Sequence, residues 1–175
     1  MSALIIFQAS ACYAQSKESV LKVSLDSLVA GIEHYVEKSV VVEGIVIHVC
    51  GVDGKKIKLK GDSGAVIKIV PDEILGVFDG SLKDKKIRVW GIAGEKRIDS
   101  AYIDSLQALR KPVCHVDHQT CKSESWREKL EKEGVLDQKM LEAASAMREK
   151  VAKSDKGYYS RISILASKIE EIPPD

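Results

Sequence analysis

The sequence predicts a β-rich α+β fold, in which a small barrel of strands carries a helical insertion. Short β-branched runs separated by glycine turns fill residues 40–93. A helical spacing of apolar residues then lasts to about residue 153, after which Tyr158–Ile169 returns to a β-rich pattern. Alternation with a period of two indicates strands, and recurrence at three and four residues indicates helices.

The first expected elements are a short helix and a long strand. Ser24 can cap a helix from Leu25 to about Val36, because a serine hydroxyl accepts a hydrogen bond from the first helical turn. Val40–Cys50 is β-branched and mostly apolar, which predicts a strand. Gly44 interrupts it, and a glycine inside a strand is typical of a bulge or a sharp bend.

Two glycine turns and a proline organise the next segment. The turns VDG and GDSG flank a run in which lysines and apolar residues alternate, which predicts a hairpin. Strands are expected at Lys56–Lys60, Ala65–Val70 and Asp84–Ala93, with a short helix at Asp72–Val77. Further helices are expected over residues 97–109, from Pro112, and from Ser123 or Ser125 to about Lys153 with a break at Gly134.

The last expected strand is Tyr158–Ile169. Its β-branched and aromatic content favours a strand, and Gly157 is a suitable residue to end the preceding helix. A helix with Ile162, Leu165 and Ile169 on one side is the competing interpretation.

The predicted order of strands and hairpins is that of the OB-fold, a five-stranded Greek-key barrel. The runs VVVEGIVIHVCGVDGKKIKLKGDSGAVIKIV and KKIRVWGIAGEKRIDSAY also resemble a family of uncharacterised exported bacterial OB-fold proteins. The resemblance covers residues 20–110 and implies a fold only, because that family has no established activity. Residues 20–172 are then expected to form a single OB-fold domain with a helical insertion at 96–156 between strands 4 and 5. Tyr158–Ile169 would close the barrel.

Composition limits the classes of function. The 175 residues are 30% charged with a net charge of +1, and only 5% are aromatic. This balance argues against a nucleic-acid binder, which is usually strongly basic and supplies aromatic rings for base stacking. The sequence has no apolar run long enough to span a membrane.

The N-terminus resembles the end of a secretory signal peptide. Apolar residues from Ala3 to Phe7 lead into small residues that end at Ala14, and a polar segment follows. Residues 1–14 are therefore expected to be cleaved, which predicts a periplasmic or secreted protein. Lipidation at Cys12 is the alternative, and a protein partner in the cell envelope would suit either location.

The few cysteines and histidines form two clusters. His48 and Cys50 are two residues apart on an expected strand and so share a face. Cys114, His118 and Cys121 follow helical spacing and would lie within roughly 60° of one another around a helix. Thiolate and imidazole bind zinc well, so these five residues are candidate ligands for zinc, with iron or copper as alternatives. His115 and Asp117 lie beside them, and Asp117 could orient a ligand.

Other interpretations of the same residues stay open. Cys114 could form a disulfide with Cys121 or with Cys50, provided that its segment is a loop, since a helix would hold the first two too far apart. All of these residues could also be structural. A thiol redox or haem-associated function would use Cys50 as a reactive thiolate activated by His48.

One further feature is a lysine stripe on the first hairpin, made of Lys55, Lys56, Lys58, Lys60 and Lys68. OB-folds bind oligonucleotides on this surface, although a solvated strand face protected against aggregation accounts for the pattern more simply. No catalytic motif occurs, which favours a binding module over an enzyme. The sequence therefore predicts an exported OB-fold module that holds a metal, with the redox or haem function and oligonucleotide binding as alternatives.

Overall fold

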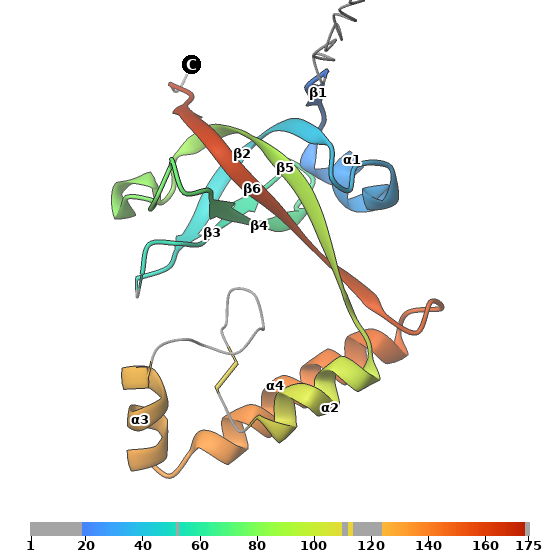
Figure 1. Ribbon diagram of the computed structural model, residues 1–175, viewed down its shortest axis with the longest axis vertical. Helices are drawn as coiled ribbons and strands as arrows, with labels where there is room; N and C mark the ends of the chain where they lie inside the picture. Colours follow the sequence, from blue (N-terminus) through green and yellow to red (C-terminus); the bar gives the residue numbers. More distant parts are fainter. Residues whose placement is uncertain (1–18, 52, 110–111, 114–123, 174–175) are drawn as a thin grey trace, which may run out of the picture.

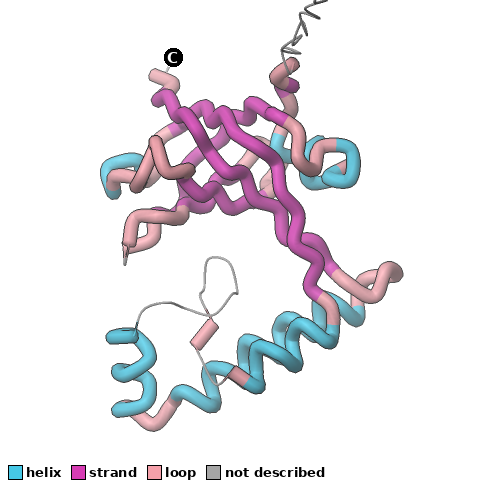
Figure 2. The backbone as a smooth tube through the Cα atoms, in the orientation of Figure 1, coloured by secondary structure: helices cyan, strands magenta, loops and turns pink. Residues whose placement is uncertain are grey.

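The computed structural model of the protein describes residues 19–51, 53–109, 112–113 and 124–173. Over these residues, strands form a barrel and most of the helical turns lie in a separate layer (Figures 1 and 2). The strands are β1 (Leu21–Lys22), β2 (Ser39–Val49), β3 (Ile57–Lys60), β4 (Val66–Pro71), β5 (Lys86–Ile98) and β6 (Tyr159–Glu171). The helices are α1 (Leu25–Ala30), α2 (Ser100–Ala108), α3 (Glu124–Lys132) and α4 (Leu136–Ala152), with 3₁₀ turns η1 (Ile32–His34) and η2 (Gly80–Leu82).

The barrel closes because β2 pairs on both sides. Its first half, Ser39–Ile45, pairs antiparallel with β5, and its second half, Ile45–Val49, pairs antiparallel with β3. The circuit continues from β3 to β4, from β4 to β6 in parallel, and from β6 back to β5. The five-stranded barrel is therefore confirmed, as is the closing role of β6 (Figure 1). The short β1 adds a parallel pairing to β2.

Gly44 lies near the point where β2 changes its partner from β5 to β3. A Cβ atom at this position would lie 2.6 Å from the carbonyl oxygen of Lys60 and 2.9 Å from side-chain carbons of Leu25 and Leu59. Only a glycine lets β3 and α1 approach so closely. Helix α1 starts at the predicted cap, since Ser24 Oγ accepts a hydrogen bond from Ser27 N–H at 3.1 Å. It then buries Leu25 and Leu28 in the barrel core.

The prediction of a short helix at Asp72–Val77 is wrong, because this segment forms a turn. The Asp72 carboxylate accepts hydrogen bonds from the N–H groups of Ile74 and Leu75 at 3.0 and 2.8 Å, which is the pattern of an aspartate-initiated turn. Gly76 then has a positive φ of 72°. Ile74 is 92% exposed, so this segment has no apolar face to bury as a helix.

The strand expected to end at Ala93 is longer than predicted. β5 continues to Ile98 because the first residues of β6 pair with it from Glu95 to Ile98. These paired ends leave the barrel as a two-stranded extension, which leads to α2 and α4 (Figure 1). We call this extension the arm and define it as Glu95–Ile98 with Tyr159–Ile162.

The helical insertion has its own small core. Asp99 caps α2, its carboxylate accepting a hydrogen bond from Tyr102 N–H at 2.8 Å. Helices α2 and α4 lie side by side and meet the end of the arm (Figure 2). A cluster distinct from the barrel core fills this junction; it contains Ile98, Ile103, Leu106, Ala144 and Met147.

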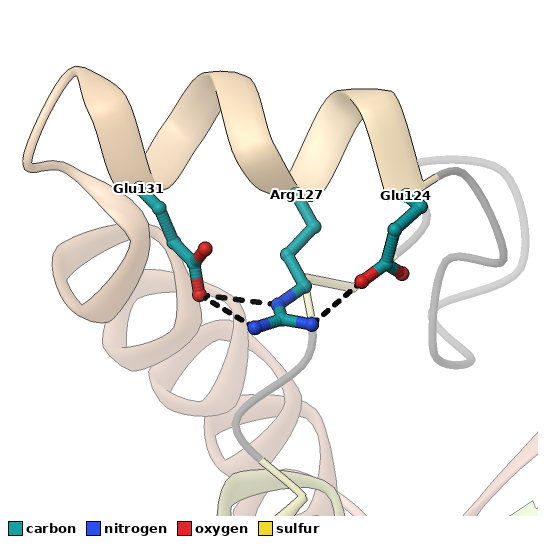
Figure 3. Close-up of polar contacts among 3 residues, drawn as sticks. All are labelled: Glu124, Arg127 and Glu131. Atoms are coloured by element: carbon teal, nitrogen blue, oxygen red, sulfur yellow. Dashed lines mark hydrogen bonds and ion pairs between the residues drawn. The ribbon is translucent and has the colours of Figure 1, made fainter.

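Helix α3 is stabilised locally by an ion-pair network. Arg127 Nη1 donates to Glu124 at 2.6 Å, and its Nη2 donates to Glu131 at 2.9 Å, so one guanidinium joins three successive turns (Figure 3). Gly134, with a φ of 68°, separates α3 from α4, as the sequence predicts. Among the helices that the structure describes, none is long and apolar enough to cross a membrane.

Candidate functional site

The second and third strands of an OB barrel, with the loops after strands 1 and 4, form the surface on which such barrels bind oligonucleotides and oligosaccharides. In this chain those strands are β3 and β4. The first loop is the segment between β2 and β3, and the second is the whole helical insertion between β5 and β6. The arm, made of the paired ends of β5 and β6, joins this second connection to the barrel.

A row of basic and polar residues crosses this face from strand to strand. His48 of β2 lies opposite Lys58 of β3, and Lys58 lies opposite Lys68 of β4. Lys68 in turn lies opposite Ser163 of β6. All four are half-buried, whereas their neighbours on β3, β4 and β6 are buried inward. Because alternate residues of a strand point to opposite faces, the row lies on the outside of the barrel.

A β-bulge places His48 in this row. Val46 is paired with Leu59, but the next pairing joins His48 to Lys58, which leaves Ile47 as an extra residue in β2. Without the extra residue, His48 would lie opposite the buried Ile57 and would be in register with the core. The bulge therefore brings the histidine to the outer face beside the lysines.

The arm continues the row with two more cations. Arg161 lies two residues before Ser163 on β6, on the same side of the strand, and it is directly opposite Lys96 of β5. We call His48, Lys58, Lys68, Arg161 and Lys96 the basic row. At ordinary strand spacing and rise, the row follows a path of roughly 25 Å.

Tyrosine rings accompany the arm's cations. Lys96 Nζ lies 4.2 Å from the centre of the Tyr102 ring on α2. Arg161 Cζ lies 5.8 Å from the Tyr159 ring, and Lys150 Nζ of α4 lies 5.5 Å from that same ring. Cations at such distances are attracted to the ring face. Three cations and two rings thus gather where the arm meets the helices.

The opposite face of the arm has a different character. The Glu95 carboxylate accepts hydrogen bonds from Ser160 Oγ and, at 3.3 Å, from Arg97 Nε. The Arg97 guanidinium also lies 4.9 Å from the Tyr158 ring. Glu95 lies on the face of the arm opposite to that of Lys96 and Arg161, because alternate residues of a strand point to opposite faces. Its carboxylate is therefore held by Ser160 and Arg97, away from the basic row.

A shallow hollow adjoins the histidine end of the row. Its cavity volume is about 630 Å³, and His48, Cys50, Asp53, Phe78 and Lys83 are among the residues that line it. Cys50 is buried, and its N–H donates to the carbonyl of Lys56 at 2.8 Å. His48 and Cys50 therefore border one hollow.

The other predicted ligands lie outside the described residues: Cys114, His115, Asp117, His118 and Cys121. Within the part of the chain that the structure describes, no three cysteine, histidine or acidic side chains gather in a way that could hold a metal. The zinc site and the disulfide alternatives stay predictions. Sequence reasoning did single out Lys58 and Lys68, but it missed Lys96, Arg161 and the tyrosines beside them, Tyr102 of α2 and Tyr159 of β6.

No protein-family model and no curated protein matches the chain. Among solved structures, the chain is similar to an aspartyl-tRNA synthetase from Entamoeba histolytica, at 12% identity and a TM-score of 0.35 over 98% of this chain and 25% of that chain. A Leishmania major Friedlin protein assigned as an aspartyl-tRNA synthetase gives 10% identity and a TM-score of 0.36, over 95% and 23% of the two chains. The chain thus spans about a quarter of these proteins, and such distant similarity identifies no family.

Proposed function

We propose that this protein is an OB-fold binding module that holds an extended polyanion, a single-stranded oligonucleotide, along its basic row. The observation that carries the proposal is the cross-strand alignment of His48, Lys58 and Lys68 on the face formed by β3 and β4. Single-stranded nucleic acids bind in positively charged grooves that follow the phosphate backbone. A row of cations at strand spacing provides such a path.

The energetics of the row support an anionic ligand. Lys58 and Lys68 are directly opposite each other, as are Lys96 and Arg161. Like charges at directly opposite positions of neighbouring strands destabilise a sheet. A phosphate bound between two such cations would interact favourably with both, so the arrangement suits an anionic ligand.

The expectation from composition pointed the other way. A net charge of +1 is a property of the whole chain, whereas binding depends on where the charges lie. In this protein many acidic side chains pair within the helices and on other parts of the barrel, as Glu43 does with Arg88 at 2.8 Å. The strand register gathers basic residues on one face, so a chain of low net charge can still present a local surface for an anionic ligand.

Salt dependence of binding tests the proposal. The full chain is titrated against a fluorescein-labelled 15-nucleotide thymidine strand, and anisotropy is followed at several salt concentrations. Lys58→Gln/Lys68→Gln should lower the affinity and reduce the slope of log K against log salt by about 1.4, because each phosphate contact on a single strand contributes about 0.7. The matched control Lys129→Gln/Lys132→Gln removes two charges from α3 and should leave both quantities unchanged.

Two outcomes would overturn the proposal. One is the absence of binding by the unmodified chain at low salt. The other is an equal loss of affinity in the barrel variant and in the control, because the interaction would then follow net charge and not the basic row.

A second candidate function is metal binding, and the shared hollow of His48 and Cys50 favours it. Thiolate and imidazole are zinc ligands, and residues of the Cys114 cluster would complete the set. Elemental analysis of protein purified without an affinity tag should then give close to one equivalent of zinc, iron or copper, and Cys50→Ser should lose most of it. Less than about a tenth of an equivalent of any transition metal, with reduced thiols, would exclude this candidate.

Thiol reactivity separates the metal candidate from a redox function of the same residue. Rapid alkylation of Cys50 in the native protein would favour a reactive thiolate. Protection that is lost on adding a chelator would favour a bound metal.

A further inference from the structure

We infer that the arm is a second contact zone for the same ligand, where unpaired bases stack on tyrosine rings while the neighbouring cations hold the phosphates. This inference rests on the proposed function and names its ligand more narrowly. The barrel part of the basic row would hold the backbone alone, without regard to the bases. The arm would require bases that are free to stack, so the ligand is a single strand and not a duplex.

The composition of the junction carries the argument. The whole chain has five tyrosines, and Tyr102 and Tyr159 lie within 6 Å of three cations, Lys96 and Arg161 of the arm and Lys150 of α4. Both rings are half-buried, so each is partly accessible from solvent. Aromatic rings beside cations are the combination that single-strand binding proteins use, because a base stacks on the ring and its phosphate pairs with the charge.

The two faces of the arm also differ in charge. Lys96 and Arg161 lie opposite each other on one face, and the Glu95 carboxylate is held by Ser160 and Arg97 on the other. An anionic strand leaving the barrel at Lys68 therefore meets a cationic surface on the side of the tyrosines. The paired strands of β5 and β6 make this surface rigid, so little ordering is needed on binding.

An abasic oligonucleotide tests the role of the bases. It has the phosphates of the thymidine strand but no rings to stack, and both are titrated at 15 nucleotides against the unmodified chain. The abasic strand should bind about tenfold more weakly, since stacking one base on an aromatic side chain gives roughly that factor or more. Tyr102→Leu keeps an apolar side chain against the helical core and should reduce the difference in affinity between the two strands, because Tyr159 is then the ring that remains at the junction.

A length series locates the second zone. Lys96→Gln/Arg161→Gln should weaken binding of a 15-nucleotide strand and leave a 5-nucleotide strand unaffected, because the short strand fits on the barrel. Lys58→Gln/Lys68→Gln should weaken both. Circular dichroism and thermal melting of each variant establish that it is folded before its affinity is interpreted.

The outcomes separate this inference from the proposed function. Equal binding of the abasic and thymidine strands by the unmodified chain would overturn the stacking role, while the barrel proposal would stand. Equal losses at both lengths in the arm variant would overturn the second zone. If the unmodified chain binds neither strand at low salt, the proposed function fails and this inference fails with it.

Discussion

Lys58 and Lys68 lie directly opposite each other on the antiparallel strands β3 and β4, on the outer face of the barrel. A phosphate placed between two such lysines can interact with both ammonium groups, so the charge at either position should control the affinity for an anionic strand.

Lys58→Glu should reduce the affinity of the protein for a single strand more than Lys58→Gln does. The new carboxylate repels a phosphate, whereas the glutamine amide only removes the attraction of the lysine. Anisotropy at low salt measures the affinity of both variants. Lys132→Glu on α3 is the control and should leave the affinity unchanged. Equal affinities of Lys58→Glu and Lys132→Glu would contradict a contact between Lys58 and the strand.

Gly91→Ala should destabilise the barrel at its closing seam. A Cβ atom here would lie 2.2 Å from the carbonyl oxygen of Leu165 and 2.6 Å from Ile164 Cγ2. The register shift after Trp90 shows that the strands are already irregular at this point. Backbone must move to relieve the overlap, so a loss of about 3 kcal/mol is expected in urea unfolding.

Gly80→Ala is the matched control for that substitution. Nothing lies within 4 Å of a Cβ atom at Gly80, so its stability should change by less than about 0.5 kcal/mol. Similar losses in the two variants would contradict the close approach of β5 and β6 at Gly91.

Glu43 should make the stability depend on pH in the acidic range. The hydrogen bond from Arg88, at 2.8 Å, is the main cause that holds the pKa of Glu43 below its usual value of 4.5, and Lys22 contributes at 3.5 Å. Because the pKa is lower in the folded state, the stabilisation is complete above about pH 4.5 and is lost as pH falls through the depressed value.

Glu43→Gln should therefore be less stable than the unmodified chain at pH 7, by about 0.5 kcal/mol, and the difference should disappear in stronger acid. Urea midpoints measured between pH 2.5 and 7 give this comparison. Glu128→Gln, an exposed change on α3, should run parallel to the unmodified chain at every pH. A Glu43→Gln difference that stays constant with pH would show that the carboxylate charge is not its source.

The sequence predicted the elements better than it predicted their pairing. Gly44 and Gly134 marked a change of partner strand along β2 and the end of α3, because a glycine's conformational range leaves a local signal. Gly157 does not end a helix, since α4 ends at Ala152 and Gly157 lies shortly before β6. The helix predicted at Asp72–Val77 is a turn, since an aspartate before three helix-compatible residues can start a turn as well as a helix. The outward exposure of Ile74 decided between them, and exposure is not visible in the residues themselves.

The candidate site depends on the register of the paired strands, which local sequence patterns do not determine. Lys96 and Arg161 are far apart in the chain and meet only because β5 and β6 continue together beyond the barrel. His48 joins the lysines only because of the bulge at Ile47. A shift of one residue in either place would move these side chains to the other face, so local patterns could suggest cations but could not align them.

Met147→Ala should loosen the helical insertion more than the barrel. Met147 is 1% exposed and belongs to the cluster at the end of the arm, with Ile98, Ile103 and Ala144, which is separate from the barrel core. Removing its side chain leaves a cavity, and the free energy of unfolding of this region should fall by about 3 kcal/mol. Native-state hydrogen exchange should then show faster exchange in α2 and α4, while the core strands of the barrel keep their protection, because opening occurs in cooperative units.

Leu59→Ala, inside the barrel core, should accelerate exchange in β2, β3 and β4 instead. If Met147→Ala lowers protection equally in the helices and in β3, the two clusters unfold as one cooperative unit. That outcome would contradict the prediction.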